Sequence, residues 1–117
     1  MEKSEILIEL AAVFRWTARL DMHEGIANHF SVCSQDNDGF FINKSGSHFS
    51  QIKASDLIHV NNNNYEQLKD KPEIVDPTAI NIHGEIHKKV PHAKCILHAH
   101  SKYCLLYTSP SPRDSDT

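Results

Sequence analysis

Two histidines near the end of a short apolar segment have the spacing of a metal-binding pair. The segment from Lys94 to Ser101 follows a proline and is rich in apolar residues, which predicts a β-strand whose side chains alternate between two faces. His98 and His100 then share one face, with their Cα atoms roughly 6.5 to 7 Å apart from about 3.3 Å per residue. Both rings can reach one zinc ion at Zn–N distances of about 2.0 to 2.1 Å. The alternative is a strand end with one exposed and one hydrogen-bonded histidine.

Length and composition are those of one small globular domain. The chain has 117 residues, 39% of them hydrophobic, and a net charge of −3 without a cluster of lysine and arginine, which argues against a nucleic-acid partner. The acidic start and the lack of an apolar run near ~18 residues predict a cytoplasmic protein with no membrane partner. Cys33, Cys95 and Cys104 are odd in number and irregularly spaced, so we expect reduced, mostly buried thiols.

The periodicity of apolar residues predicts a chain that alternates helices and strands. The first helix has Ser4 as a candidate N-cap, and the second has Asp76 as N-cap followed by Pro77. The polar segment 65–75 shows no clear pattern beyond a strand near Ile74. We predict helices over residues 4–20 and 77–89, a helical turn over 50–56, and strands near 30–34, 39–43, 57–60 and 94–100.

The second helix carries two histidines one turn apart. His83 lies on the apolar stripe of this helix and His87 follows at i+4, a spacing that can bind a metal. The interpretation that we favour is a core-facing, hydrogen-bonded His83 and an exposed His87. The stripe itself consists of Ala79, Ile82, Ile86 and Val90.

Two polar loops at strand ends have the composition of anion-binding loops. Asn28, His29 and Ser31 follow a glycine and offer polar donors, and the loop at 43–47 holds Ser45 and Gly46 beside Lys44, a candidate counter-charge. Small residues allow close approach of a phosphate to the backbone. Each loop taken alone is more typical of an ordinary turn.

Taken together, these segments resemble the class II aldolase/adducin domain from Glu5 to about Tyr103. The resemblance implies a three-layer α/β/α fold, here incomplete at the C-terminus. The motifs are Glu24-Gly25-Ile26-Ala27-Asn28-His29-Phe30-Ser31, Ile42-Asn43-Lys44-Ser45-Gly46, Ala54-Ser55-Asp56-Leu57, Pro77-Thr78-Ala79 with His83, and His98-Ala99-His100-Ser101.

The resemblance implies metal-dependent chemistry on a small substrate. Enzymes of this family, such as fuculose-phosphate aldolase and ribulose-phosphate 4-epimerase, use zinc or a similar divalent ion to polarise carbonyl and hydroxyl oxygens and to stabilise an enediolate. It implies His98 and His100 as two metal ligands, and Asn28, His29, Ser45 and Gly46 as residues that bind a substrate, often a phosphorylated hydroxy-carbonyl compound. The parent protein would be a lyase or epimerase and a homo-oligomer.

Two positions depart from the sugar-phosphate aldolases and resemble the adducin-like branch. Ala79 occupies the position of the catalytic acid, four residues before His83, and Asn28-His29 replaces a Gly-Asn pair. No catalytic residue is therefore assigned. A non-catalytic, adducin-like module that binds protein partners is the alternative.

The end of the chain differs in character from the rest. Residues 104–117 have no periodicity and resemble the translation of a sequencing adapter, whereas the alternative is a Ser/Pro-rich disordered tail. We expect a truncated domain over residues 1–103 and a non-native or disordered tail over 104–117. The family's third histidine would lie beyond this point, so we expect the 117-residue chain to bind metal weakly and to be inactive.

Overall fold

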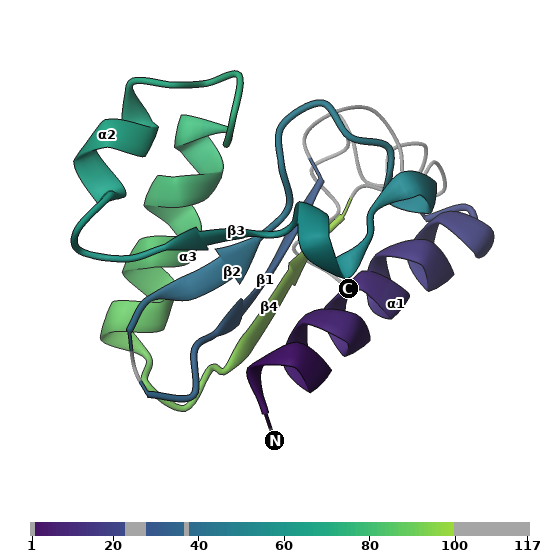
Figure 1. Ribbon diagram of the computed structural model, residues 1–117, viewed down its shortest axis with the longest axis horizontal. Coiled ribbons are helices and arrows are strands. Elements are labelled where there is room, and N and C mark those ends of the chain that lie inside the picture. The colour runs from purple at the N-terminus through teal and green to yellow at the C-terminus, as the bar shows by residue number, and fades with distance from the viewer. Residues whose placement is uncertain (1, 23–27, 37, 100–117) are drawn as a thin grey trace, which may run out of the picture.

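A four-stranded antiparallel sheet forms the centre of the computed structural model, which describes residues 2–22, 28–36 and 38–99 (Figure 1). The strand order is β3-β2-β1-β4, and every neighbouring pair is antiparallel. The predicted metal ligand His100 and the predicted tail over residues 104–117 lie outside the described residues. The elements are α1 (Lys3–Arg19), β1 (His29–Cys33), β2 (Phe40–Ile42), β3 (Ile58–Val60), α2 (Tyr65–Lys69), α3 (Pro77–Lys89) and β4 (Cys95–His98), with 3-10 turns at Phe49–Gln51 and Ala54–Asp56.

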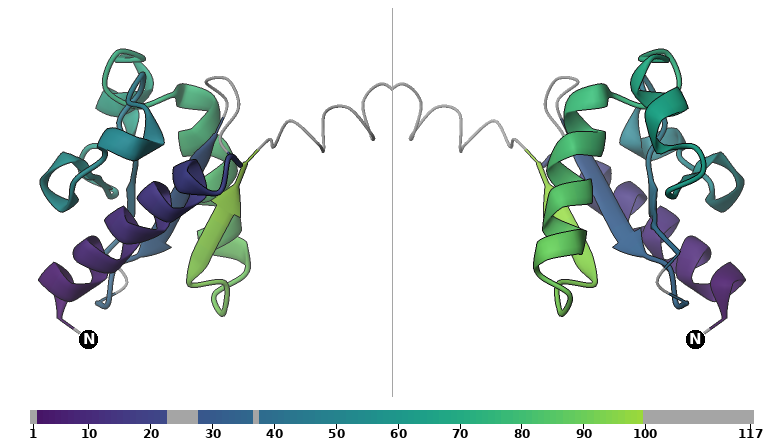
Figure 2. Two further views of the ribbon diagram at one scale, coloured as in Figure 1. Left: turned by 90° about the vertical axis from the view of Figure 1, so that its right-hand side faces the viewer. Right: turned by 90° about the vertical axis from the view of Figure 1, so that its left-hand side faces the viewer.

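Helices cover both faces of this sheet and give three layers, as predicted. Helix α1 lies on one side and α3 on the other, which the two side views make plain (Figure 2). One core lies beneath α1 and the other beneath α2 and α3. The core beneath α1 consists of Leu10, Phe14, Phe30, Phe49 and Ile52. The other consists of Phe40, Ile42, Val60, Leu68, Val75, Ala79 and Ile80.

The two long helices begin with different capping arrangements. Helix α1 begins one residue earlier than predicted, because Glu2 and not Ser4 is the N-cap and the Glu2 N–H donates to Glu5 Oε1 (3.3 Å). Helix α3 begins as predicted, with Asp76 Oδ1 accepting the Thr78 N–H (2.9 Å) and Pro77 in the first turn. None of the helices in the described part of the chain is long and apolar enough to cross a membrane.

Two local predictions were wrong. The segment 65–75 contains the short helix α2, and Ile74 lies in a turn; a helix of five residues has too few turns to show a periodic pattern. The buried face of α3 is also rotated from the predicted stripe, because Ile80 is fully buried whereas Ile82 is 40% exposed. Ala79 and His83 lie on both the predicted and the observed face, so spacing alone did not identify the face that packs on the sheet.

Candidate functional site

The pairing of β1 with β4 places two histidines opposite each other. His29 and His98 are register partners, their ring centroids are 4.5 Å apart, and His29 Nε2 lies 3.2 Å from His98 Nδ1. Partners in a β-ladder point to the same face of a sheet, so both rings lie on the α3 side. His29 is 4% exposed and His98 is half-buried.

Helix α3 adds a third imidazole to this pair. His83 Nε2 lies 2.6 Å from His29 Nδ1, and His83 Nδ1 lies 2.5 Å from Ser31 Oγ. Neither His83 nor Ser31 is exposed at all. The prediction of a core-facing, hydrogen-bonded His83 is confirmed, whereas Ser31 is enclosed and is not the anion donor that the sequence suggested.

A fourth imidazole continues the series toward the surface. His87 Nε2 lies 2.7 Å from Ser31 Oγ, and His87 Nδ1 lies 3.1 Å from the carbonyl oxygen of Ala93. The prediction of an exposed His87 was wrong, because the chain after α3 turns back and encloses the ring. His87 is half-buried and stacks on Phe40 at 5.1 Å between centroids.

Burial keeps the two α3 imidazoles uncharged. Removal from water, followed by the nearby His29, His87 and His98 rings, lowers the pKa of His83 from 6.5 to about 3. Burial also lowers the pKa of His87, with the Ala93 carbonyl opposing the shift and Lys94 adding to it. Both rings are therefore neutral near pH 7, and each has one nitrogen that donates and one that accepts.

Asn43 joins the two loops that were predicted to bind a substrate. Its Oδ1 accepts the Phe30 N–H (3.1 Å) and its Nδ2 donates to the carbonyl of Asn28 (3.3 Å). Asn28 and Asn43 are both buried, so these bonds are shielded from water. The sequence shows only that Asn43 lies at the end of β2. Its bridging role between the two loops is visible only in the tertiary structure.

The two loops enclose a cavity of about 440 Å³ at the first turn of α3. All four predicted substrate-binding residues line it, together with Lys44, and the helix N-terminus adds a partial positive charge that the Asp76 cap offsets. Ala79 lines this cavity where the sugar-phosphate aldolases have an acid. The full lining is Asn28, His29, Asn43, Lys44, Ser45, Gly46, Ser47, His48, Pro72, Asp76, Pro77 and Ala79.

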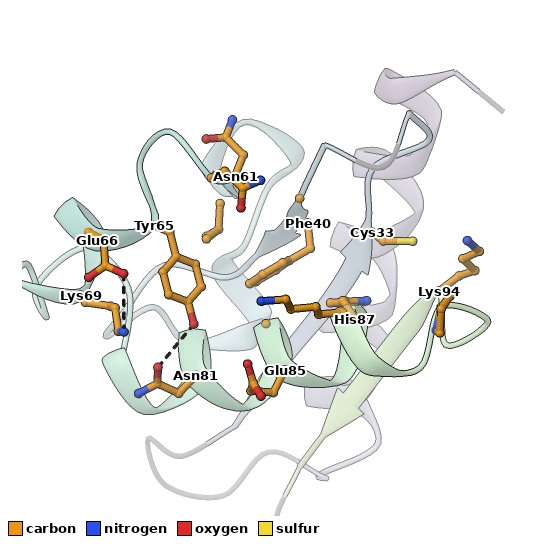
Figure 3. Close-up of a pocket in the computed structure, with 16 residues that line it drawn as sticks. Cys33, Phe40, Asn61, Tyr65, Glu66, Lys69, Asn81, Glu85, His87 and Lys94 are labelled. Carbon is orange, nitrogen blue, oxygen red and sulfur yellow. Dashed lines mark hydrogen bonds and ion pairs between the residues drawn. The ribbon is translucent and has the colours of Figure 1, made fainter.

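A larger cavity of about 950 Å³ lies between α2, α3 and the sheet (Figure 3). Figure 3 shows the Tyr65 hydroxyl directed at Asn81 of α3 (3.5 Å), and the His87 ring beside Phe40. Of the predicted site residues that the structure describes, none lines it. The smaller cavity is therefore the candidate substrate site, and the histidine series connects the two through His29 and His87.

The described histidines do not by themselves form a metal site. Within residues 2–22, 28–36 and 38–99, no group of three or more His, Cys, Asp or Glu side chains is arranged to hold an ion. The nitrogens of His29, His83 and His98 face one another at hydrogen-bond distances, so they do not converge on one point. His98 nevertheless fits a ligand role, because ligating histidines usually hydrogen-bond through the second ring nitrogen.

Residues 8–114 match the family described as Class II Aldolase and Adducin N-terminal domain. The Meiotically up-regulated gene 14 protein of Schizosaccharomyces pombe is 35% identical over 99 residues, covering 84% of this chain and 38% of that protein. The adducin-related protein C1289.14 of the same yeast is 35% identical over 104 residues, covering 82% and 32%. An L-fuculose 1-phosphate aldolase from Glaciozyma antarctica PI12 superposes with a TM-score of 0.74 at 30% identity, covering 86% and 42%. The chain thus spans less than half the length of each.

Proposed function

Because this chain belongs to the class II aldolase and adducin family, we propose that the longer protein it represents is a divalent-metal-dependent aldolase or epimerase. Its substrate would be a small hydroxy-carbonyl compound, including phosphorylated sugars. His98 and His100 would be two of the metal ligands, with zinc as the first ion to test.

The observation that carries this proposal is the contact between His98 and His29 at the edge of the smaller cavity. His29 lines the cavity and lies 3.2 Å from the Nδ1 of His98. A ligand from β4 is thereby held next to the space that a substrate would occupy. When bound, a divalent ion supplies Lewis-acid polarisation of a carbonyl or hydroxyl oxygen.

The remaining lining residues would bind and orient the substrate. Lys44 offers a positive charge, and Ser45 and Gly46 offer small residues at a bend, with Gly46 at φ +76° and no atom within 4 Å of the position that a Cβ would occupy. Asn28 is held in place by Asn43. This set suits an anionic group beside Lys44 and leaves the reacting carbons toward His29.

A non-catalytic binding module is the second candidate. The cavity carries Ala79 where an acid would lie, and one of the relatives is adducin-related. A module of this kind needs no metal. Zinc affinity therefore separates the two candidates.

Calorimetric titration of zinc into the longer protein and into this chain tests the proposal. The longer protein should bind zinc tightly, and the 117-residue chain weakly, because catalytic zinc normally has three protein ligands. His98→Ala should lower the affinity of the longer protein by at least about tenfold, since loss of even a supporting residue costs 10- to 100-fold. Leu97→Ala is the matched control, because Leu97 is the neighbouring β4 residue and is 57% exposed.

Two outcomes would contradict the metal-dependent assignment. Absence of zinc binding by the longer protein would favour the binding module. Equal affinity of the parent and the His98→Ala variant would place the metal elsewhere. Tight binding by the 117-residue chain would instead show that a third ligand is already present in it.

A further inference from the structure

Four imidazoles and one hydroxyl form a series of hydrogen bonds that ends at a backbone carbonyl. A carbonyl oxygen accepts and never donates, so the Ala93 carbonyl (3.1 Å) requires that His87 Nδ1 carries the proton. His87 is neutral, because burial lowers its pKa. Its Nε2 must therefore accept, and the atom it faces is Ser31 Oγ (2.7 Å).

Ser31 passes this constraint to the next ring. A hydroxyl has a single proton, and Ser31 gives it to His87, so Ser31 Oγ must accept from His83 Nδ1 (2.5 Å). With its proton on Nδ1, neutral His83 accepts at Nε2. The nitrogen that faces it, His29 Nδ1 (2.6 Å), is then the donor.

His29 completes the series. His29 is 4% exposed, and in its neutral form with the proton on Nδ1 its Nε2 accepts, so the group that faces it, His98 Nδ1 (3.2 Å), is the donor. We infer that this chain of bonds runs in one direction, from His98 to Ala93, and fixes His98 as the tautomer with the proton on Nδ1 and the lone pair on Nε2. Ser31, His29, His83 and His87 are then positioning residues for the ligand role in the proposed function, on which this inference rests.

Because the series of hydrogen bonds is buried, reversing the direction of one of its bonds is unfavourable. His83 and Ser31 are fully enclosed, so water does not compete for their hydrogen bonds. Among the described residues, every buried side-chain nitrogen and oxygen has a hydrogen-bond partner. A reversed ring would set two donors or two acceptors against each other and leave buried polar groups unsatisfied.

The direction of the hydrogen bonds matters for the proposed ligand His98, because a metal binds the ring nitrogen that has the lone pair. An acceptor behind a ligating histidine fixes its tautomer and raises its basicity. The acceptor here is a neutral imidazole, whereas a carboxylate or carbonyl is usual. Its accepting nitrogen is determined by the Ala93 carbonyl, through the hydrogen bonds of His87, Ser31 and His83.

Nitrogen NMR of the histidine side chains tests the direction in the metal-free 117-residue chain near pH 7.5. Two-bond proton–nitrogen correlations identify the protonated nitrogen of each neutral ring. We expect the Nδ1–H tautomer for His29, His83, His87 and His98. An Nε2–H tautomer, or a mixture, at His29, His83 or His98 would overturn the inference.

Two substitutions at His87 separate positioning from packing. His87→Phe keeps a ring against Phe40 but removes the acceptor of the Ser31 proton, so His83, His29 and His98 should populate both tautomers. His87→Gln retains an acceptor and should restore the parental spectra. Lys88→Ala, at an exposed site on the same helix, is the control. Unchanged tautomers in His87→Phe, or equal disturbance in both His87 variants, would contradict the inference.

Zinc titration of the same variants links the series to the ligand. His87→Phe should lower zinc affinity in the longer protein by about tenfold, the low end of effects from residues behind metal ligands. Expected tautomers without zinc binding would leave the inference standing and remove the proposed function. Zinc binding together with other tautomers would support the proposed function and overturn the inference.

Discussion

The two faces of strand β1 are both buried and yet are built in opposite ways. Phe30 points beneath α1 into an aromatic cluster, with centroid distances of 4.9 Å to Phe14 and 4.9 Å to Phe49. Its neighbours His29 and Ser31 point beneath α3 into the imidazole series. A strand of alternating side chains thus separates an apolar layer from a polar one.

The difference shows what each face contributes. Burial of the aromatic rings is non-directional and stabilises in proportion to the area removed from water. Each bond of the imidazole series depends on one particular proton position, and loss of a single partner leaves a buried group unsatisfied. Along β1, the α1 side therefore contributes apolar packing, while the α3 side holds side chains in defined protonation states.

Truncation of the aromatic face should have the largest effect. Phe14 is fully buried and contacts Phe30 and Phe49, so Phe14→Ala should lower the free energy of unfolding by about 3–5 kcal/mol. Urea denaturation measures this, and Phe14→Leu serves if the alanine variant does not fold. Trp16→Ala, at a site on the same helix that is 59% exposed, should change stability by no more than about 0.5 kcal/mol. Similar losses for both would show that α1 does not pack as described.

Acidification should lower the stability of the protein through the imidazoles on the α3 side of β1. The pKa of His83 is about 3 in the folded protein and near 6.5 in the unfolded chain, so below pH 6.5 the unfolded chain binds a proton that the folded protein excludes. Stability should therefore be constant above pH 6.5 and fall by about 2 kcal/mol between pH 6.5 and pH 5, from about 1.4 kcal/mol per unit. The lowered pKa of His87 acts in the same direction.

Replacement of the ring provides the control for this pH dependence. His83→Gln should be less stable near pH 7, because His29 and Ser31 lose their partner, but should have a shallower slope between pH 6.5 and pH 5. Urea midpoints at three pH values in this interval measure both. An unchanged slope in His83→Gln would assign the pH dependence to other groups.

Most of the fold was predictable from local sequence. The start of α3 followed from Asp76 and Pro77, and β3 and β4 followed from short apolar runs, because caps and alternation are encoded within a few residues. The rotation of α3 was not predictable from spacing. Which stripe faces the sheet depends on the shape of the core beneath it, as exposed Ile82 and buried Ile80 show.

The residues of the candidate site could be predicted from the sequence, but the contacts between them could not. The motifs named His29 and His98 separately, and strand register alone makes them partners across 69 residues of sequence. Ser31 was interpreted as an anion donor because its polarity, and not its enclosure, is visible in the sequence. Links between distant residues depend on tertiary packing, so the roles of Ser31 and His87 required the structure.

A double-mutant cycle tests whether the two faces are independent, and here we expect the smallest effect. Ser31→Ala should cost about 1–3 kcal/mol by leaving the His83 Nδ1–H and His87 Nε2 without a buried partner, and Phe14→Leu should cost about 1 kcal/mol. Phe14 and Ser31 lie on opposite sides of β1, so the two costs should add within about 0.5 kcal/mol in urea denaturation. A coupling above about 1 kcal/mol would mean that packing under α1 sets the position of the β1 backbone on which the imidazole series depends. The aromatic face would then be part of the positioning of His98.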